Sequence, residues 1–297
     1  MVYVHGGGFT SMSPNRGETF AAALQQAGIA VALVGYRLSV PVDRNGHPTR
    51  DGVQHPAHAQ YIAEAVRFLV EHASHPRVNL DPARRGIMEH SAGARLAGML
   101  LTNPTFLDEV GLSTADWTAG LLIDSEAYRF DDTLPRDRPV LSPLTRSIYG
   151  ISRRADAPGP AARPVGYIGG ALYDVVETPQ TRRSSPVLYP SLASGAGAPP
   201  VYDPPHRYNA SPYYNITAGD PVAPLLLVYG TAPGRRAAAV QMRDAALAAG
   251  QPRARTLETT LNHGQINWHF GRSDLGPEAR RYTESVIAWL QRRFAQA

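Results

Sequence analysis

Strand-like and helix-like segments alternate along most of the chain, and this alternation limits the fold more than any other feature. The strand-like segments occupy residues 2–5, 29–37, 84–89, 118–124, 222–230 and 253–259. Segments with apolar residues at helical spacing follow at residues 17–27, 56–74, 91–101, 235–249 and 277–294. Strands that alternate with helices build a mostly parallel central sheet flanked by helices, so we expect an α/β fold.

Residues 131–220 interrupt the alternation. This stretch is rich in Pro, Gly, Ser and Arg and has little periodicity. A segment of that length inside a compact domain is usually functional or disordered. We therefore expect a single domain over residues 1–297, with 131–220 inserted as a lid above the carboxyl ends of the strands; a surface excursion is the alternative. Under the lid hypothesis its tyrosines help to line a substrate pocket: Tyr167, Tyr173, Tyr189, Tyr202, Tyr208, Tyr213 and Tyr214.

The composition excludes several classes of function. The 297 residues contain no Cys, which rules out disulfides, thiolate metal sites and a cysteine nucleophile. No apolar run approaches the ~20 residues of a membrane-spanning helix, so we expect no membrane span. Localisation stays open, and the cytoplasm is preferred only because no signal-peptide pattern is visible. All 29 basic residues are Arg, as in GC-rich bacterial genes, and no basic stripe carries interleaved aromatics, so we expect no nucleic-acid partner.

Three consecutive glycines follow the first strand-like segment, in the run His5-Gly6-Gly7-Gly8-Phe9. Hydrolysis of an ester or amide builds negative charge on the carbonyl oxygen, and backbone N–H groups aimed at that oxygen stabilise it. Glycines let the backbone approach a ligand closely. The run is therefore a candidate oxyanion hole, and the alternative is a plain glycine turn.

A serine and a histidine occur in the places that this chemistry needs. Ser91 lies between an apolar strand and a helix in "IMEHSAGARLAG", which is the strand–turn–helix context of a nucleophile elbow. His263 lies in "LETTLNHGQINW", where we expect a loop between the last strand and the last helix. The order of oxyanion loop, Ser and His is that of α/β-hydrolases.

These segments resemble the HGGG-type branch of the α/β-hydrolase fold, the hormone-sensitive-lipase-like and kynurenine-formamidase-like esterases. The matching stretches are His5–Phe9, "GYRLS" at 35–39, "HPAHAQYIAEAVRFL" at 55–69, Ser91–Gly93, "NPTFLDEVGLS" at 103–113, "LLLVYGTA" at 225–232 and "HGQIN" at 263–267. The resemblance implies that Ser91 is the nucleophile and His263 the general base. It also implies that the N–H groups of Gly7, Gly8 and Ala92 form the oxyanion hole.

The third member of a catalytic triad is not evident. The family's acid usually follows the strand that corresponds to "LLLVYG", but this chain continues Gly230-Thr231-Ala232-Pro233, and the next carboxylate, Asp244, should face away on a helix. Asp124 and Glu126, at the end of the strand 118–124, are the other candidates, with Asp124 closer to the strand terminus. We expect either an Asp124–His263 contact or a Ser–His dyad with no acid, and prefer the dyad. An acid orients the His rather than breaking bonds, so its loss need not abolish activity.

Two further departures from the family are visible. The elbow pattern G-x-S-x-G has Glu89 at its first position, where the tight turn normally requires a small residue. A glutamate there must point away or bend the turn. The resemblance also implies two antiparallel strands ahead of residues 2–5, and the sequence begins at Met1 without them. We therefore expect an N-terminally short version of the fold, from a truncated gene product or from a start assigned too late.

The leading hypothesis is a serine esterase that acts on small or medium carboxylic esters through a Ser91 acyl-enzyme. Cleavage of an aryl formamide by the same residues is an alternative, and so is a catalytically impaired hydrolase that binds a small molecule or a partner. We expect a small-molecule ester or amide substrate and no cofactor. Metal-dependent hydrolysis is disfavoured because no H-E-x-x-H or comparable spacing appears among the ten His residues. The sequence does not indicate the oligomeric state.

Overall fold

The computed structural model of the 297-residue chain describes residues 1–39, 53, 55–76, 78–128, 151–153, 166–168, 171–175, 211–219 and 221–297. The chain divides into two compact units. The first comprises residues 1–36, 59–129 and 211–297, and the second comprises residues 37–58 and 130–210.

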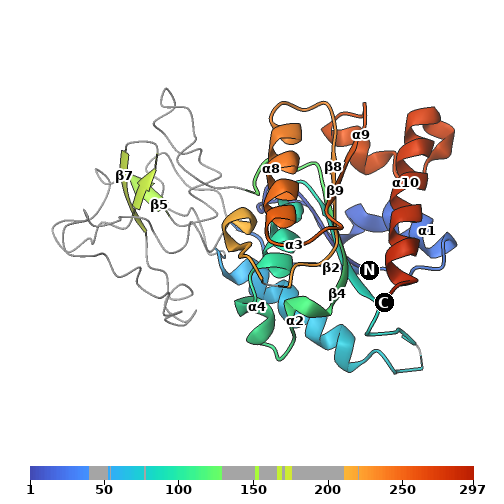
Figure 1. Cartoon of the computed structure of the whole chain (residues 1–297), viewed down its shortest axis with the longest axis horizontal. Coiled ribbons are helices and arrows are strands. Elements are labelled where there is room, and N and C mark those ends of the chain that lie inside the picture. Colours follow the sequence, from blue (N-terminus) through green and yellow to red (C-terminus); the bar gives the residue numbers. More distant parts are fainter. Residues whose placement is uncertain are drawn as a thin grey trace. The chain divides into compact units, whose positions relative to one another are not determined.

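A six-stranded parallel sheet forms the centre of the first unit (Figure 1). Its strand order is β2-β1-β3-β4-β8-β9. The strands are β1 (Val2–Val4), β2 (Ala32–Val34), β3 (Arg85–His90), β4 (Trp117–Ile123), β8 (Leu225–Tyr229) and β9 (Arg255–Glu258). All six were expected at these places in the sequence. The expected strand over 29–37 is reduced to three residues. Because the strands are parallel, their carboxyl ends meet at one edge, and this edge receives the residues that follow each strand.

Helices cover both faces of this sheet. Figure 1 shows α1 (Glu18–Gln26) and α10 (Pro277–Phe294) on one face, with α3 (Ala92–Thr102) and α8 (Arg235–Ala248) on the other. These four helices and α2 (Ala57–Glu71) agree with the helical spacing in the sequence to within three residues at each end. The short helices were not expected. They are α4 (Thr105–Asp108), α9 (His263–Trp268), and the 3-10 turns η1 (Pro14–Gly17), η2 (Thr114–Asp116), η4 (Pro212–Asn215) and η5 (Ser273–Leu275).

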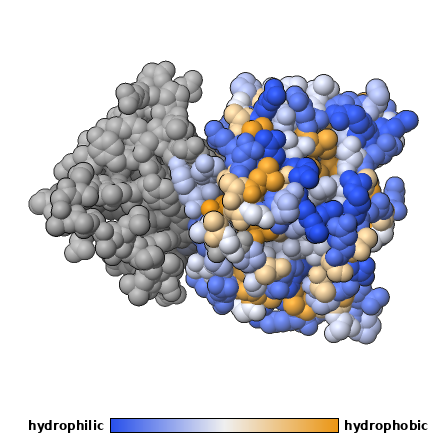
Figure 2. All heavy atoms as spheres, viewed as in Figure 1, coloured by the Kyte–Doolittle hydropathy of each residue, from blue (hydrophilic) through white to orange (hydrophobic). Residues whose placement is uncertain are grey.

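The core follows from the alternation of side chains along the strands. Tyr3, Met88 and Leu121 point to the face covered by α1 and α10, where they pack with Phe20 and Tyr282. The intervening residues of β1, β3 and β4 point to the face covered by α3. Hydrophilic residues cover most of the first unit's visible surface (Figure 2). Among the described residues, no helix is long and apolar enough to cross a membrane.

The second unit contains a feature that the sequence did not indicate. Its strands β5 (Ile151–Arg153), β6 (Gly166–Ile168) and β7 (Ala171–Val175) form an antiparallel sheet in the order β5-β7-β6. Most of the predicted lid over 131–220 lies outside the described residues, so its role stays a prediction. Of its tyrosines, Tyr213 and Tyr214 belong to η4 in the first unit, where their rings meet edge to face.

Candidate active site

Ser91 occupies a sharp turn at the carboxyl edge of the sheet. It follows the last residue of β3 directly and precedes α3, and its backbone has φ 63° and ψ −122°. Its N–H donates to the carbonyl oxygen of Ile123 at 2.9 Å, which holds the turn against the end of β4. A positive φ is strained for a residue with a Cβ. The turn therefore lifts the Ser91 side chain out of both the strand and the helix.

The turn is tight enough that only glycine fits two residues later. A Cβ on Gly93 would lie 2.7 Å from the carbonyl oxygens of Val4 and His5 and 2.8 Å from Oε2 of Glu89. The elbow of β3 and α3 thus packs directly onto the end of β1. This contact brings the glycine run beside the serine.

His263 reaches Ser91 from the opposite end of the chain. Its Nε2 lies 3.0 Å from the Ser91 Oγ, within hydrogen-bond range. The expected loop is in fact the first turn of α9. Asn262 caps this helix by accepting from the N–H groups of Gly264 and Gln265, and Gln265 completes a capping box. A capped helix start fixes the His263 backbone better than a free loop would.

Asp124 lies on the other side of the imidazole. It is fully buried, and its Oδ2 is 2.5 Å from the His263 Nδ1. Its Oδ1 accepts the N–H of Gly230 at 2.8 Å. Of the two arrangements expected for the acid, the structure therefore has the Asp124–His263 contact and not the preferred dyad.

The position of Asp124 depends on two close approaches. Asp124 follows β4 with φ 52°, which turns its carboxylate toward β8. Gly230, at the end of β8, lies so near the backbone before His263 that a Cβ there would be 2.2 Å from the carbonyl oxygen of Leu261. The Thr231 N–H donates to that same oxygen at 3.1 Å. Strand order and this glycine together bring the Asp124 carboxylate and the His263 imidazole into contact.

Charge around Asp124 keeps the carboxylate ionised. Burial alone would raise the pKa of Asp124, but its hydrogen bonds with His263 and Gly230 and the positive charge of Arg235 outweigh burial, and the pKa is lowered. The Arg235 Nε lies 3.9 Å from the Asp124 Oδ2, at the start of α8. Arg235 was not singled out in the sequence, where it looks like one of several scattered arginine pairs.

A second imidazole packs against the first. The His90 Nε2 lies 3.0 Å from the His263 carbonyl oxygen, and the two rings are 4.5 Å apart between centroids. Burial, followed by the charge of His263, lowers the pKa of His90 to about 3. A neutral His90 with its proton on Nε2 donates to that carbonyl and helps to hold His263 in place. Its adjacency to Ser91 was the one signal in the sequence.

The glycine run lies beside the elbow. A Cβ on Gly6 would come 2.8 Å from the His90 carbonyl oxygen and 3.1 Å from the Ser91 Cβ. Gly7 and Gly8 have φ of 103° and 60°, which favour glycine. The Ala92 N–H belongs to the first residue of α3, so it has no acceptor within the helix. The predicted oxyanion donors therefore belong to two backbone segments, and these segments meet where Gly6 packs against His90 and Ser91.

Tyr36 supports the start of the glycine run. Its hydroxyl donates to the His5 carbonyl oxygen at 3.1 Å, and its ring stacks on the His5 ring at 4.4 Å. Both side chains are buried. In the sequence Tyr36 belongs to the stretch 35–39, where nothing indicates a role for it.

The remaining candidate acids are not in this arrangement. Glu126 is 63% exposed and lies 3.8 Å from Arg235. Asp244 is exposed on α8 and pairs with its neighbour Arg243, so it faces away as expected. Pro233, at the place after β8 where the resemblance implied an acid, has no carboxylate.

Another Ser–His pair differs in an instructive way. In the second unit, the Ser39 Oγ is 2.9 Å from the His58 Nε2, but the Ser39 hydroxyl also donates to the Val53 carbonyl oxygen at 2.7 Å. Its proton is therefore committed to the backbone, and His58 must donate rather than accept. This pair is arranged to hold structure rather than to activate a nucleophile.

His90, Asp124 and His263 also form a group whose ligand atoms lie within 4.8 Å of one another, a spacing that could hold a metal ion. Both ring nitrogens of His263 already have partners, Asp124 on one side and Ser91 on the other. We therefore interpret His263 and Asp124 as partners of Ser91 rather than as metal ligands, with His90 packed beside them.

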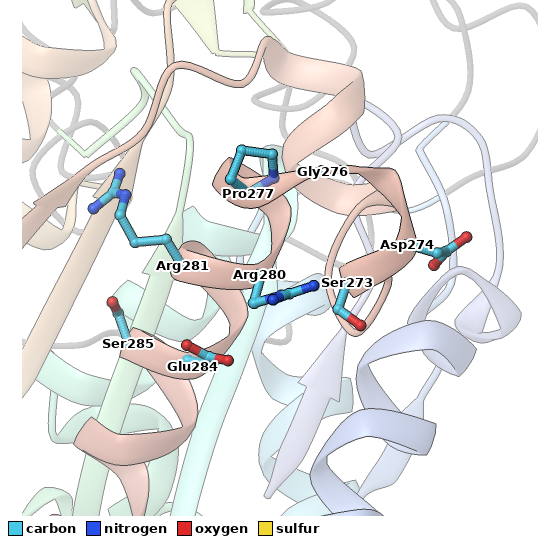
Figure 3. Close-up of a pocket in the computed structure, with 8 residues that line it drawn as sticks. All are labelled: Ser273, Asp274, Gly276, Pro277, Arg280, Arg281, Glu284 and Ser285. Carbon is cyan, nitrogen blue, oxygen red and sulfur yellow. The ribbon is translucent and has the colours of Figure 1, made fainter.

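A separate hollow lies at the N-terminal end of α10 (Figure 3). It has a volume of about 520 Å³ and is lined by Ser273, Asp274, Gly276, Pro277, Arg280, Arg281, Glu284 and Ser285. Two of its charged side chains are already paired, Asp274 with Arg272 and Arg281 with Glu278. The hollow contains none of the Ser–His–Asp residues.

Comparison with known proteins agrees with this fold. The BD-FAE family model matches residues 1–114. No curated protein matches the chain. The thermophilic esterase Est2 of Thermogutta terrifontis is 18% identical, with a TM-score of 0.60 over 98% of this chain and 82% of Est2. The hyperthermophilic esterase of Pyrobaculum calidifontis is also 18% identical, with a TM-score of 0.56 over 98% of this chain and 73% of that one. An esterase/lipase from an uncultured bacterium has a TM-score of 0.55 at 18% identity, over 99% of this chain and 76% of its own. With its parallel sheet flanked by helices and these structural neighbours, the chain has the α/β-hydrolase fold.

Proposed function

We propose that this protein is a serine hydrolase that cleaves small or medium carboxylic esters, with Ser91 as nucleophile, His263 as general base and Asp124 as the acid that orients it. One observation carries the proposal. The His263 imidazole bridges the other two side chains: its Nε2 lies 3.0 Å from the Ser91 Oγ, and its Nδ1 lies 2.5 Å from the Asp124 Oδ2. A nucleophile held by a base that a third group orients is the arrangement that acyl transfer requires.

The first half of the reaction forms an acyl-enzyme. The Ser91 Oγ attacks the carbonyl carbon of the ester while the His263 Nε2 takes the hydroxyl proton. The negative charge that develops on the carbonyl oxygen is stabilised by N–H groups of Gly7, Gly8 and Ala92. The tetrahedral intermediate then collapses, and His263 gives its proton to the departing alkoxide, which leaves as the alcohol.

The second half of the reaction restores the enzyme. A water molecule loses a proton to His263 and attacks the acyl carbon, and the same N–H groups stabilise the second tetrahedral intermediate. Its collapse releases the carboxylic acid and returns the proton to Ser91. In both halves Asp124 stabilises the imidazolium without taking its proton.

The structural neighbours support a short acyl chain. Est2 of Thermogutta terrifontis was solved with propionate bound and with butyrate bound, both of which are short carboxylates. The same esterase has also been solved phosphoramylated by tabun, an organophosphorus reagent. We therefore expect activity to be highest on acetyl to butyryl esters and to fall as the acyl chain lengthens.

The test combines covalent labelling with a panel of substrates. A fluorophosphonate probe should label the wild-type chain and fail to label Ser91→Ala, which should also lose p-nitrophenyl butyrate hydrolysis. Ser39→Ala is the matched control, because Ser39 also faces a histidine but belongs to the Ser39–His58 pair. Labelling that survives Ser91→Ala would disprove the assignment. Faster turnover of N-formylkynurenine than of any ester would make the protein a formamidase, and a chain that neither labels nor turns over substrate would be an impaired hydrolase.

A further inference from the structure

Glu89 is an ionisable residue that is buried between apolar strands. It is the fifth residue of β3, two residues before Ser91, and it pairs in register with Val4 of β1 and Leu122 of β4. Its side chain points to the face covered by α3 and is fully buried. An unpaired charge in such a place is costly, so a glutamate there needs a partner or must be neutral.

The two carboxyl oxygens of Glu89 have different surroundings. Oε1 accepts the N–H of Ala97, in the second turn of α3, at 3.2 Å. Oε2 is buried and accepts no hydrogen bond from the described residues. Oε2 and the carbonyl oxygens of Val4 and His5 all lie within 2.8 Å of the point that a Cβ of Gly93 would occupy.

Each of these three oxygens lies close to the same point beside Gly93, and oxygens grouped without a donor repel one another, so a proton on one of them would turn repulsion into attraction. The two carbonyls accept only, whereas a protonated carboxyl both accepts at one oxygen and donates at the other. No ion pair joins Glu89 to a cation within the described part of the chain. Glu89 in its ionised form adds to burial in raising the pKa values of Tyr3, Tyr36 and Tyr128, so these hydroxyls lie within its electrostatic reach. Burial likewise raises the pKa of Glu89 well above its usual value.

We propose that Glu89 is a neutral carboxylic acid and a positioning residue, whose Oε2–H donates to the carbonyl oxygen of Val4 or His5 and so ties the nucleophile elbow to the start of the oxyanion loop. The single proton joins β3 and α3, which carry Ser91 and Ala92, to β1, which leads into Gly7 and Gly8. Its Oε1 meanwhile fixes the register of α3 through Ala97.

The consequence for catalysis rests on the proposed function. The N–H donors for the oxyanion come from two separate segments, one after β1 and one at the start of α3, so their spacing depends on how firmly these segments are held together. A misplacement of about 1 Å in such a site can cost about 100-fold in rate. A neutral acid also avoids a negative charge beside the place where the oxyanion forms.

Two variants of similar size separate the role of the proton from that of packing. Glu89→Gln keeps a donor and an acceptor without a charge, so it should retain most of the wild-type kcat. Glu89→Met fills the space without either, so kcat should fall about 100-fold while KM for p-nitrophenyl butyrate changes little. Amide hydrogen exchange at Gly6, Gly7 and Gly8 should accelerate in Glu89→Met and stay slow in Glu89→Gln.

Infrared spectroscopy reports the proton directly and does not depend on activity. The wild-type minus Glu89→Gln difference spectrum at pH 7 should contain the carbonyl stretch of a protonated carboxylic acid, and a carboxylate band in its place would overturn the proposal. Equal loss of kcat in Glu89→Gln and Glu89→Met would overturn it too, as would wild-type kcat in Glu89→Met. If the wild-type chain shows no turnover and no fluorophosphonate labelling, the proposed function fails, while infrared and hydrogen exchange still decide the role of Glu89.

Discussion

Replacing Asp124 with Asn should nearly abolish turnover, for a reason that the local hydrogen bonds determine. The Gly230 N–H donates to the Asp124 Oδ1 at 2.8 Å, and only an oxygen can accept it. In Asp124→Asn the amide oxygen therefore stays at Gly230, and the amide nitrogen faces the His263 Nδ1. Because that nitrogen donates, Nδ1 must accept, and the imidazole proton moves to Nε2. The Nε2 that should take the Ser91 proton is then already protonated.

The size of the effect follows from this change of tautomer. In a serine triad the same replacement costs ~10,000-fold in kcat, which corresponds to ~5 kcal/mol of transition-state stabilisation. KM should change little, because the lost interaction is with the imidazolium that forms only during reaction. In a Ser–His dyad, by contrast, the same replacement would have almost no effect. The two mechanisms thus differ by several orders of magnitude.

The assay is steady-state hydrolysis of p-nitrophenyl butyrate, with the fluorophosphonate labelling rate as a second readout of Ser91 activation. Asp244→Asn is the matched control, since Asp244 is exposed on α8 and should leave both rates unchanged. Pro233→Asp is the converse test and should not raise turnover, because the position of the acid is already filled. If Asp124→Asn retains kcat within tenfold of wild type while its thermal unfolding is normal, the triad reasoning is refuted.

Three further changes test the surroundings of the site. Gly93→Ala places a methyl group within 2.8 Å of three oxygens, so we expect a loss of ~1–3 kcal/mol in unfolding free energy and slower fluorophosphonate labelling. Gly264→Ala is the control and should be nearly neutral. Equal melting temperatures for Gly93→Ala and the wild type would contradict the close packing of the elbow. Arg235→Gln removes a cation near Asp124, and the pKa of Asp124 then rises. We expect kcat/KM to fall about two- to tenfold at the acidic end of its pH profile and less at pH 8. An unchanged pH profile would mean that Arg235 has no electrostatic effect on the site. Because the folded state raises the pKa of Glu89 above its usual 4.5, the wild type should lose stability as pH rises from 4.5 through the raised pKa. Melting temperatures measured from pH 4 to 9 should therefore show Glu89→Gln gaining stability relative to wild type over this window. A difference in melting temperature that does not change with pH would count against a buried proton.

The sequence predicted the sheet well because its pattern is strong. Strands buried on both faces are continuous apolar runs, as in "LLLVY" of β8, and the long helices have an apolar face at regular spacing. The short elements were missed for the opposite reason. The capped start of α9 at Asn262 is a local hydrogen-bond feature with little periodicity, so His263 was expected in a loop.

The site was predictable as far as local motifs reach. The motifs around Ser91 and the glycine run can each be recognised from a few residues of sequence. Their order along the chain associates them with His263. The contact between Asp124 and His263 spans 139 positions. It depends on β4 lying between β3 and β8 and on Gly230 admitting the backbone of Leu261. No local sequence pattern indicates the strand order or this close approach, so the sequence favoured the Ser–His dyad.

The proposed nucleophile and the proposed acid, Ser91 and Asp124, share one backbone property. Ser91 and Asp124 both have positive φ, at 63° and 52°, and neither is glycine. Each such residue costs on the order of 1–3 kcal/mol. A glycine at either position would relieve that cost and at the same time remove the side chain. Selection for thermal stability alone would therefore tend to erase the site, and a thermostabilised variant that keeps both residues must gain its stability elsewhere in the fold.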